Sequence, residues 1–175
     1  ALYDVHFIDQ KTGWMVGEFG KIYHSTDGGA TWIEQQNSLL GQAGFDDALN
    51  LPVLFGVHFR NATEGVAVGI EGKVVKTTDG GKQWTFVAED VSQFDSSAFY
   101  APLLFENGTG WIVGASGRVL QLQNGEWKNA PMGMRVISWL RSIDFFDDKH
   151  GWIVGGYGTI LSTSDGGKTW LPRLG

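Results

Sequence analysis

The sequence predicts an all-β protein, a β-propeller built of four-stranded antiparallel blades, because a glycine-rich pattern and a turn both recur along it. The pattern Gly-Trp-x-Val-Gly occurs in four copies that begin at Gly13, Gly65, Gly110 and Gly151, with Val66 replacing the tryptophan in the second. Another glycine follows each copy after two intervening residues. A period of about 40 to 50 residues is typical of propellers. Four short antiparallel strands per repeat make one blade.

Each repeat has room for four short strands. In the first repeat we expect them at Tyr3–Ile8, Trp14–Glu18, Lys21–Ser25 and Thr31–Gln35. These segments are bounded by turn residues and rich in β-branched and aromatic side chains. A phenylalanine leads every repeat, and the four are Phe7, Phe59, Phe105 and Phe145. The blades then span approximately residues 1–36, 52–90, 99–130 and 139–175 of a single domain, 1–175.

Three repeats contain a turn of the form Ser/Thr-x-Asp-Gly-Gly followed by a tryptophan. Glycine allows the positive φ of such a turn, and the aspartate accepts hydrogen bonds from its backbone N–H groups. Because the same residues recur at the same repeat position, we interpret them as structural rather than catalytic or metal-binding. They are Asp27, Gly29 and Trp32, then Asp79, Gly81 and Trp84, then Asp165, Gly167 and Trp170. Each tryptophan is expected to fill the gap between adjacent blades.

Composition excludes several classes of function. The chain has 175 residues, 42% of them hydrophobic and 18% charged, with a formal net charge of −6. The negative charge argues against nucleic-acid partners. The lack of cysteine excludes disulfides and thiolate metal sites. No apolar run approaches the length of a transmembrane helix, which is about 18 residues. No cofactor or phosphate-binding loop is predicted, since the glycines recur with the blade period.

Histidines and acidic pairs offer weaker candidates for a site. His6 and His58 occupy matching positions before Phe7 and Phe59, where they either line the inner channel or share a structural role. We favour the structural role, because two histidines alone do not make a metal site. The pairs at 46–47 and 147–148 are interpreted as solvated loop acids.

The connections between repeats are the expected places for function, since loops on a rigid scaffold carry most binding residues. Residues 36–52 form an insertion whose part 44–50 is expected to make a short helical turn, and residues 90–102 include Phe94. The connection 131–142 holds two methionines, Met132 and Met134, and a cluster of arginine and tryptophan that suits a protein-binding surface. In the alternative, Trp139 caps the core and the arginines pair with Asp144, Asp147 or Asp148. The candidate binding residues are Arg135, Trp139, Arg141, Arg118 and Tyr157.

The turn Ser/Thr-x-Asp-x-Gly-x-Thr-Trp resembles the bacterial neuraminidase repeat, or Asp-box. The first and fourth copies match it, the second has Gln83 in place of threonine, and the third keeps only residues 123–127, Gln-Asn-Gly-Glu-Trp. The longer unit, over nearly the whole chain, is similar to the photosystem II stability/assembly factor family. This resemblance implies a non-catalytic propeller scaffold that binds other proteins in the periplasm or outside the cell, with the targeting segment absent from this chain.

The alternative function is a sialidase-like glycoside hydrolase or a carbohydrate-binding propeller. Sialidase chemistry needs an arginine cluster, a Tyr–Glu nucleophile pair and an acid/base aspartate. None of the five arginines has the Arg-Ile-Pro setting typical of sialidases, and the tyrosines have no obvious glutamate partner. We therefore predict no catalytic residues. The four blades either close as a small ring or form a segment of a larger propeller, and an open arc would favour self-association through its apolar faces.

Overall fold

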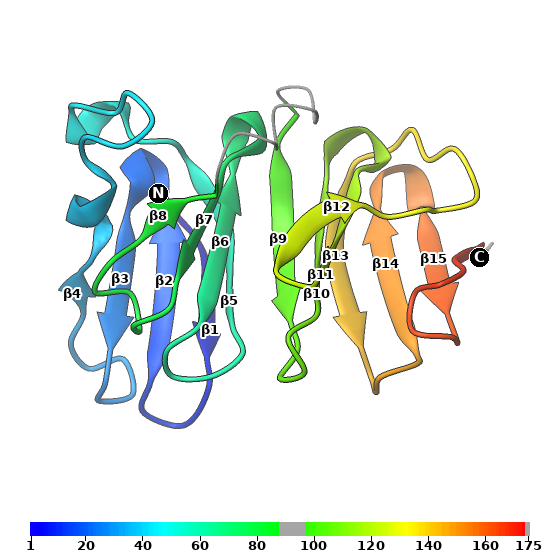
Figure 1. Cartoon of the computed structure of the whole chain (residues 1–175), viewed down its shortest axis with the longest axis horizontal. Helices are drawn as coiled ribbons and strands as arrows, with labels where there is room; N and C mark the ends of the chain where they lie inside the picture. The colour runs from blue at the N-terminus through cyan, green and yellow to red at the C-terminus, as the bar shows by residue number, and fades with distance from the viewer. Residues whose placement is uncertain (88–96, 174–175) are drawn as a thin grey trace. The chain divides into compact units, whose positions relative to one another are not determined.

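The computed structural model describes residues 1–87 and 97–173, which form four antiparallel sheets of four strands each (Figure 1). The first sheet contains β1 (Leu2–Phe7), β2 (Gly13–Gly17), β3 (Ile22–Ser25) and β4 (Ile33–Glu34). The second contains β5 (Leu54–Phe59), β6 (Gly65–Gly69), β7 (Val74–Thr77) and β8 (Thr85–Phe86). The third contains β9 (Phe99–Leu104), β10 (Gly110–Gly114), β11 (Val119–Gln123) and β12 (Glu126–Asn129). The fourth contains β13 (Leu140–Phe145), β14 (Gly151–Gly155), β15 (Ile160–Thr163) and β16 (Leu171–Pro172).

Strands follow one another in chain order within every sheet, which is the arrangement of a propeller blade. The prediction of four-stranded antiparallel blades is therefore confirmed. The last three residues of the predicted range 52–90, the last two of 139–175, and Phe94 lie outside the described residues.

Close neighbours leave no room for a side chain at either glycine of the Gly-Trp-x-Val-Gly pattern. A Cβ on Gly13 would lie 2.7 Å from the ring of Phe7, which covers it from the first strand. A Cβ on Gly69 would lie 1.9 Å from the carbonyl oxygen of Val53. That oxygen accepts a hydrogen bond from Ile70 N at 3.0 Å. The glycine at position 69 therefore lets Val53, which directly precedes β5, approach the turn that follows β6. The pattern thus encodes strand pairing at both ends of the second strand.

The turn between the second and third strands has the same left-handed geometry in every sheet. In the first sheet φ is 56° at Phe19 and 61° at Gly20, and Lys21 N donates to Glu18 O at 3.1 Å. Two central residues with positive φ define a type I′ turn, whose twist suits a tight hairpin. The turns are η1 (Glu18–Gly20), η4 (Ile70–Gly72), η6 (Ala115–Gly117) and η7 (Gly156–Gly158). The strands predicted at Trp14–Glu18 and Lys21–Ser25 each extend one residue too far, because Glu18 and Lys21 belong to this turn.

The third sheet departs from the expected repeat at two places. Leu104, not Phe105, pairs with Gly110 as Phe7 pairs with Gly13, so the phenylalanine predicted to lead this repeat is displaced by one residue. In place of an Asp-box, Asn124 and Gly125 join β11 to β12 with φ of 52° and 80°. An Asn-Gly pair with positive φ at both residues is a type I′ hairpin turn, which needs no aspartate.

The chain divides into two compact units, Ala1–Ala98 and Phe99–Gly175, and each unit contains two sheets. In the core of the first unit, β2 and β3 of the first sheet pack against the second sheet. The residues of this core include Trp14, Val16, Ile22, Leu54, Phe59 and Trp84. The core of the second unit is built in the same way from Trp111, Val113, Val119, Ile143, Ile153 and Trp170. A single blade cannot bury both faces alone, so the pair of sheets is the smallest unit with a closed core.

The connection 36–52 packs against the second sheet instead of standing apart from it. It contains η2 (Gln36–Leu39) and η3 (Ala48–Asn50), and the second of these is the short helical turn predicted within residues 44–50. Leu39 is fully buried in the core of the first unit. Ser38 Oγ accepts a hydrogen bond from Trp84 N at 2.8 Å, and Gln42 Nε2 donates to Trp84 O at 2.9 Å. This connection therefore holds the residue that precedes β8.

Candidate functional site

The Asp-box turns of the first and fourth sheets are closed by hydrogen bonds to their aspartates. Asp27 accepts from Ser25 Oγ at 2.8 Å, from Thr31 N at 2.9 Å and from Thr31 Oγ1 at 2.6 Å. These donors favour the ionised carboxylate, and with the Thr31 hydroxyl as the largest cause they lower the pKa of Asp27 to about 2. Asp165 has the equivalent bonds and a pKa of about 2. Both carboxylates are thus occupied within their own turns.

The Asp-box of the second sheet lacks one of these bonds because Gln83 replaces the threonine. Asp79 accepts from Thr77 Oγ1 at 2.9 Å and from Gln83 N at 3.0 Å. The backbone N–H of Gln83 is the largest cause that lowers the pKa of Asp79. Trp84 and Trp170, which follow the second and fourth turns, are 0% and 2% exposed, while Trp32 is only partly buried.

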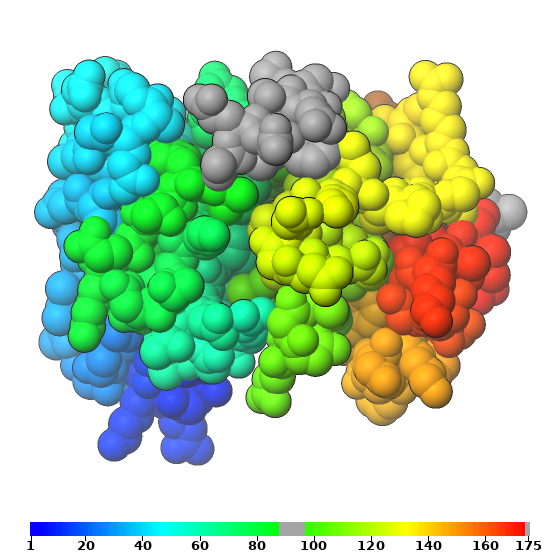
Figure 2. All heavy atoms as spheres, in the orientation of Figure 1, coloured from blue at the N-terminus to red at the C-terminus, as the bar shows by residue number. Residues whose placement is uncertain are grey.

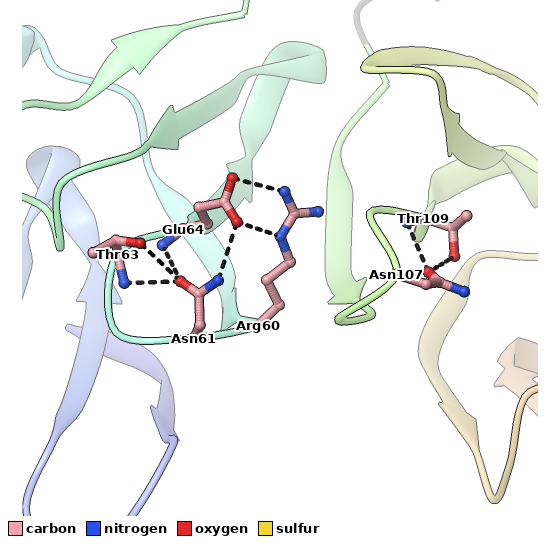
Figure 3. Close-up of polar contacts among 6 residues, drawn as sticks. All are labelled: Arg60, Asn61, Thr63, Glu64, Asn107 and Thr109. Carbon is pink, nitrogen blue, oxygen red and sulfur yellow. Dashed lines mark hydrogen bonds and ion pairs between the residues drawn. The ribbon is translucent and has the colours of Figure 1, made fainter.

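The hairpin between the first and second strands carries a second repeated turn that sequence reasoning missed. Asn61 Oδ1 accepts from Thr63 N at 2.9 Å and Glu64 N at 2.8 Å, and Arg60 forms two hydrogen bonds of 2.8 Å with Glu64 (Figure 3). Asn107 closes the equivalent turn of the third sheet through Thr109 N (Figure 3). Asp9 and Asp147 do the same in the first and fourth sheets. The available signal was an Asn or Asp three or four residues before the first glycine of each repeat.

Asp147 is therefore a turn residue, whereas the sequence suggested a solvated loop acid. It accepts hydrogen bonds from Lys149 N at 2.8 Å and from His150 N at 2.6 Å. The backbone N–H of His150 is the largest cause that lowers the pKa of Asp147 to about 2.

His6 and His58 stack on each other in the first unit, with ring centroids 4.0 Å apart. His6 Nδ1 accepts a hydrogen bond from Phe59 N at 3.1 Å, which joins β1 to β5. Burial lowers the pKa of both rings, and with the charge of His6 as a second cause it lowers that of His58 to about 3. Both rings are therefore neutral at pH 7. Across residues 1–87 and 97–173, no three His, Asp or Glu side chains gather as metal ligands.

The second unit presents an extended segment whose side chains alternate between core and surface. Met134, Val136 and Leu140 pack into the core, and Ser138 between them is buried. The exposed strip, as we call it, consists of Arg135, Ile137, Trp139 and Arg141. Ile137 is 77% exposed and Trp139 is 47% exposed. Period-two alternation places one face of an extended chain in solvent. Sequence reasoning missed Ile137, although the alternation from 134 to 141 was the signal for it.

Turn η7 supports the backbone of the exposed strip. Gly156 N donates to Trp139 O at 2.8 Å, and the hydroxyls of Ser138 and Thr159 are 2.7 Å apart. A Cβ on Gly156 would lie 2.6 Å from the Trp139 ring, so the indole lies directly over this glycine. The next residue, Tyr157, is 96% exposed at a left-handed φ of 55°. The segment after β12, yellow in the space-filling view, lies on the surface of the second unit (Figure 2).

Two predicted arginines flank the same segment. A Cβ on Gly117 would lie 2.0 Å from Val136 O, so the segment also passes over η6, and Arg118 is the next residue. The Arg141 guanidinium lies 5.4 Å from the centroid of the Tyr100 ring, which is cation–π geometry. The structure thus places Trp139 beside the turn of Tyr157 and the backbone of Arg118 beside the same segment, whereas the Arg141 guanidinium lies against Tyr100 of β9 and one terminal nitrogen of Arg118 is buried.

In the alternative interpretation Trp139 caps the core and the arginines pair with nearby aspartates. Trp139 is 47% exposed, and the core is covered here by Met132 and Met134 instead. The ion pairs within the described part of the chain do not include Arg135 or Arg141. The segment and η7 thus display two exposed aromatic rings and an exposed isoleucine, together with exposed arginines, and aromatic and arginine side chains are enriched in protein-binding hot spots.

Comparisons with known proteins agree with this architecture. A model of the family described as photosynthesis system II assembly factor YCF48 matches residues 47–136 and 119–174. The photosystem II assembly lipoprotein Ycf48 of Synechococcus sp. (strain CC9902) is 33% identical over 82 residues, which are 47% of this chain and 22% of that protein. The chain therefore spans about a fifth of the length of this relative.

Two solved structures share the fold at low sequence identity. YCF48 bound to a D1 peptide has a TM-score of 0.60 and 17% identity, over 98% of this chain and 80% of that one. An ancestral GH74 enzyme has a TM-score of 0.74 and 14% identity, over 99% of this chain and 24% of that one. Among the described residues no helix is long and apolar enough to cross a membrane. The extent of the family match shows that this chain belongs to the photosystem II assembly factor YCF48 family.

Proposed function

We propose that this chain is a non-catalytic protein-binding module of an assembly factor, and that the exposed strip with Arg118 and Tyr157 is its binding surface. The observation that carries the proposal is the outward display of Arg135, Ile137, Trp139 and Arg141 from a segment whose alternate residues are fixed in the core. A rigid backbone with exposed aromatic and arginine side chains loses little entropy on binding and supplies the residue types that dominate hot spots.

The chemistry of the surface favours a peptide with carboxylate groups and at least one apolar side chain. Guanidinium groups bind carboxylates through paired hydrogen bonds. Trp139 and Tyr157 supply apolar area at low rotamer cost. The D1-peptide complex of a family member supports a peptide as the ligand. The name of the Synechococcus relative, a lipoprotein, supports a place outside the cytoplasm, which cell fractionation with an antibody tests.

Calorimetric titration with the D1 peptide tests the binding surface. We expect saturable binding by the wild-type chain, and weaker binding by Trp139→Ala and by Arg141→Gln. The matched controls are Phe146→Ser, since Phe146 is 84% exposed on another loop, and Lys128→Gln, a cation with an exposed side chain on β12. Equal losses in the controls, or no loss in the two strip variants, would reject this surface.

The absence of catalysis is part of the proposal and has its own assay. The Asp-box carboxylates, whose oxygens already accept hydrogen bonds inside their turns, support a structural role. We expect no release of sugar from a sialoside or from soluble polysaccharides. Release that is lost on substitution of an acidic residue would assign a glycosidase instead.

A further inference from the structure

The extended segment that carries the exposed strip has backbone groups with no hydrogen-bond partner in the described chain. Within residues 1–87 and 97–173, the N–H and C=O groups of Arg135 and Ile137 take part in no hydrogen bond. The backbone is bonded again at Trp139, whose O accepts from Gly156 N at 2.8 Å. An extended chain with free N–H and C=O groups is a template for a second strand.

The other long connection, residues 36–52, bonds its backbone to itself. Leu40 N donates to Asn37 O at 3.2 Å, and Gly41 N donates to Phe45 O at 2.8 Å. These bonds close turns and leave that connection without an extended run of free groups. The free backbone of the segment at 134–138 is therefore a feature of this connection and not of every connection between sheets.

The outer strands of the sheets offer less backbone to a partner. β4, β8 and β16 are two residues long, and β16 contains Pro172, which has no N–H. β12 has four residues, of which Glu126 and Lys128 form an ion pair. Short and charged edge strands limit pairing with other chains. The segment at 134–138 is longer than any of these strands, and its one charge, on Arg135, suits an acidic partner.

The segment is also fixed before a partner binds. Met134 and Val136 pack against the core of the second unit, and the hydroxyls of Ser138 and Thr159 are 2.7 Å apart. A backbone that is already ordered loses little conformational entropy when a second strand pairs with it.

We propose that the partner of this surface binds as an added antiparallel strand along residues 134–138 and exchanges main-chain hydrogen bonds with Arg135 and Ile137. Residues two apart in an extended chain direct their backbone groups to the same edge, so one partner strand reaches all four free groups. In this mode main-chain bonds supply affinity and alternate side chains supply specificity. The binding mode rests on the proposed function, because it takes the exposed strip as the binding surface.

The same geometry defines the chemistry of the partner. Side chains directly opposite each other in an antiparallel pair lie on the same face and interact. The exposed side chains of Arg135 and Ile137 therefore meet two partner residues that are themselves two apart. Because the strands run in opposite directions, the residue opposite Ile137 comes first in the partner. The partner that fits is an extended segment with an apolar residue followed two positions later by an acidic one, and with proline at neither.

Calorimetry with a series of singly N-methylated D1 peptides tests the added strand. N-methylation removes one main-chain donor and keeps the side chain. We expect an affinity loss of about fivefold or more at two positions that are two residues apart, which is the effect of losing one hydrogen bond. The residue between them should lose less, because its N–H points to the other edge. Losses without this alternation, or no loss at any position, would overturn the added strand.

A substitution in the chain itself gives a second measurement. Ile137→Pro removes one free donor and should weaken binding of the D1 peptide about fivefold, whereas Ile137→Val keeps the donor and is the matched control. Circular dichroism checks that both variants fold. If Ile137→Pro does not fold, amide exchange in the wild type replaces it. The amides of Arg135 and Ile137 should then exchange about tenfold more slowly with the peptide bound, and that of Val136 should not change.

The results separate the added strand from the proposed function. Binding that is weakened by Trp139→Ala but is insensitive to N-methylation and to Ile137→Pro would overturn the added strand and leave the binding surface in place. No binding of the D1 peptide by the wild-type chain, or no effect of Trp139→Ala, would reject the surface and the added strand with it.

Discussion

Two connections between sheets, residues 36–52 in the first unit and residues 130–139 in the second, use their side chains in opposite ways. The first directs Leu39 into the core and Ser38 and Gln42 onto the backbone of Trp84. The second fixes alternate residues in the core and leaves Ile137 and Trp139 in solvent. The first connection also leaves Leu49 70% exposed, but its buried leucine and its hydrogen bonds to Trp84 tie it to the second sheet, so its main effect is on stability. The second connection leaves an aromatic ring and an isoleucine exposed on a fixed backbone, which suits it for binding.

The largest expected effect is the cost of truncating an apolar side chain in the buried connection. Leu39→Ala should lower the free energy of unfolding by about 2–5 kcal/mol, because it removes a fully buried side chain and leaves a cavity. Ile137→Ala in the exposed connection should change it by less than about 0.5 kcal/mol. Urea unfolding of both variants measures the difference. Similar losses in the two variants would remove the distinction between the connections.

Binding of the peptide should depend on the exposed connection and not on the buried one. Trp139→Ala should weaken binding of the D1 peptide by about 2 kcal/mol, or roughly thirtyfold in Kd, as expected for an aromatic hot spot. Leu39→Ala should leave the affinity of the folded chain unchanged, since it has no part in the exposed strip. Calorimetry under conditions where both variants are folded gives the two dissociation constants. A larger loss from Leu39→Ala would contradict the assignment of roles.

The two units should also differ in their response to acid. Burial lowers the pKa of His6 and His58, so the unfolded chain binds more protons below its histidine pKa of about 6.5, and stability falls as pH falls. For His58, whose pKa falls to about 3, the stability lost between pH 7 and pH 5 is about 2 kcal/mol. The equivalent positions of the second unit hold Leu103 and Asp144 and lack this effect.

Urea unfolding at pH 7 and pH 5 measures this loss, and His58→Gln should reduce it. The Asp-box aspartates act in a lower window, because their stabilisation is present above the ordinary aspartate pKa and lost as pH falls toward about 2. An unchanged slope between pH 7 and pH 5 in His58→Gln would show that the stacked pair is not its source.

The smallest expected effect is the gain in stability when a strained residue of a type I′ turn is replaced by glycine. A comparison of two such turns also shows which one takes part in binding. Tyr157→Gly and Ser116→Gly each remove a non-glycine residue from a left-handed position with φ of 55°, and each should gain about 1 kcal/mol of stability. The gain should be similar in both, since the two turns have the same geometry. Only Tyr157→Gly should weaken peptide binding, because only Tyr157 adds an exposed aromatic ring. Thermal unfolding and calorimetry on the pair test both statements.

The repeated residues allowed much of the fold to be predicted. The glycines of the Gly-Trp-x-Val-Gly pattern and the aspartates of the Asp-boxes act within one hairpin or on the adjacent strand, so their meaning is local. The third sheet was predicted less well, because Leu104 takes the place expected for Phe105 and Asn124-Gly125 replaces the Asp-box turn. A spacing of five residues before Gly110, against six elsewhere, was the available sign of the displacement.

The role of each connection was harder to predict because it depends on residues far away in the sequence. Ser38 and Gln42 find their partner at Trp84, more than 40 residues later. Nothing near Ser38 in the sequence indicates that hydrogen bond. The surface at 135–141 was partly predictable, since Arg135, Trp139 and Arg141 stood out by residue type. Their exposure depends on Met134, Val136 and Leu140 entering a core that only the folded unit contains.

Hydrogen exchange of the chain with and without the D1 peptide tests the contrast between the two connections most directly. The account predicts slower exchange on peptide binding in residues 134–141 and 156–159, and unchanged exchange in residues 36–52. Slower exchange in 36–52 with none in 134–141 would contradict it, and would place binding on the connection that the structure assigns to stability.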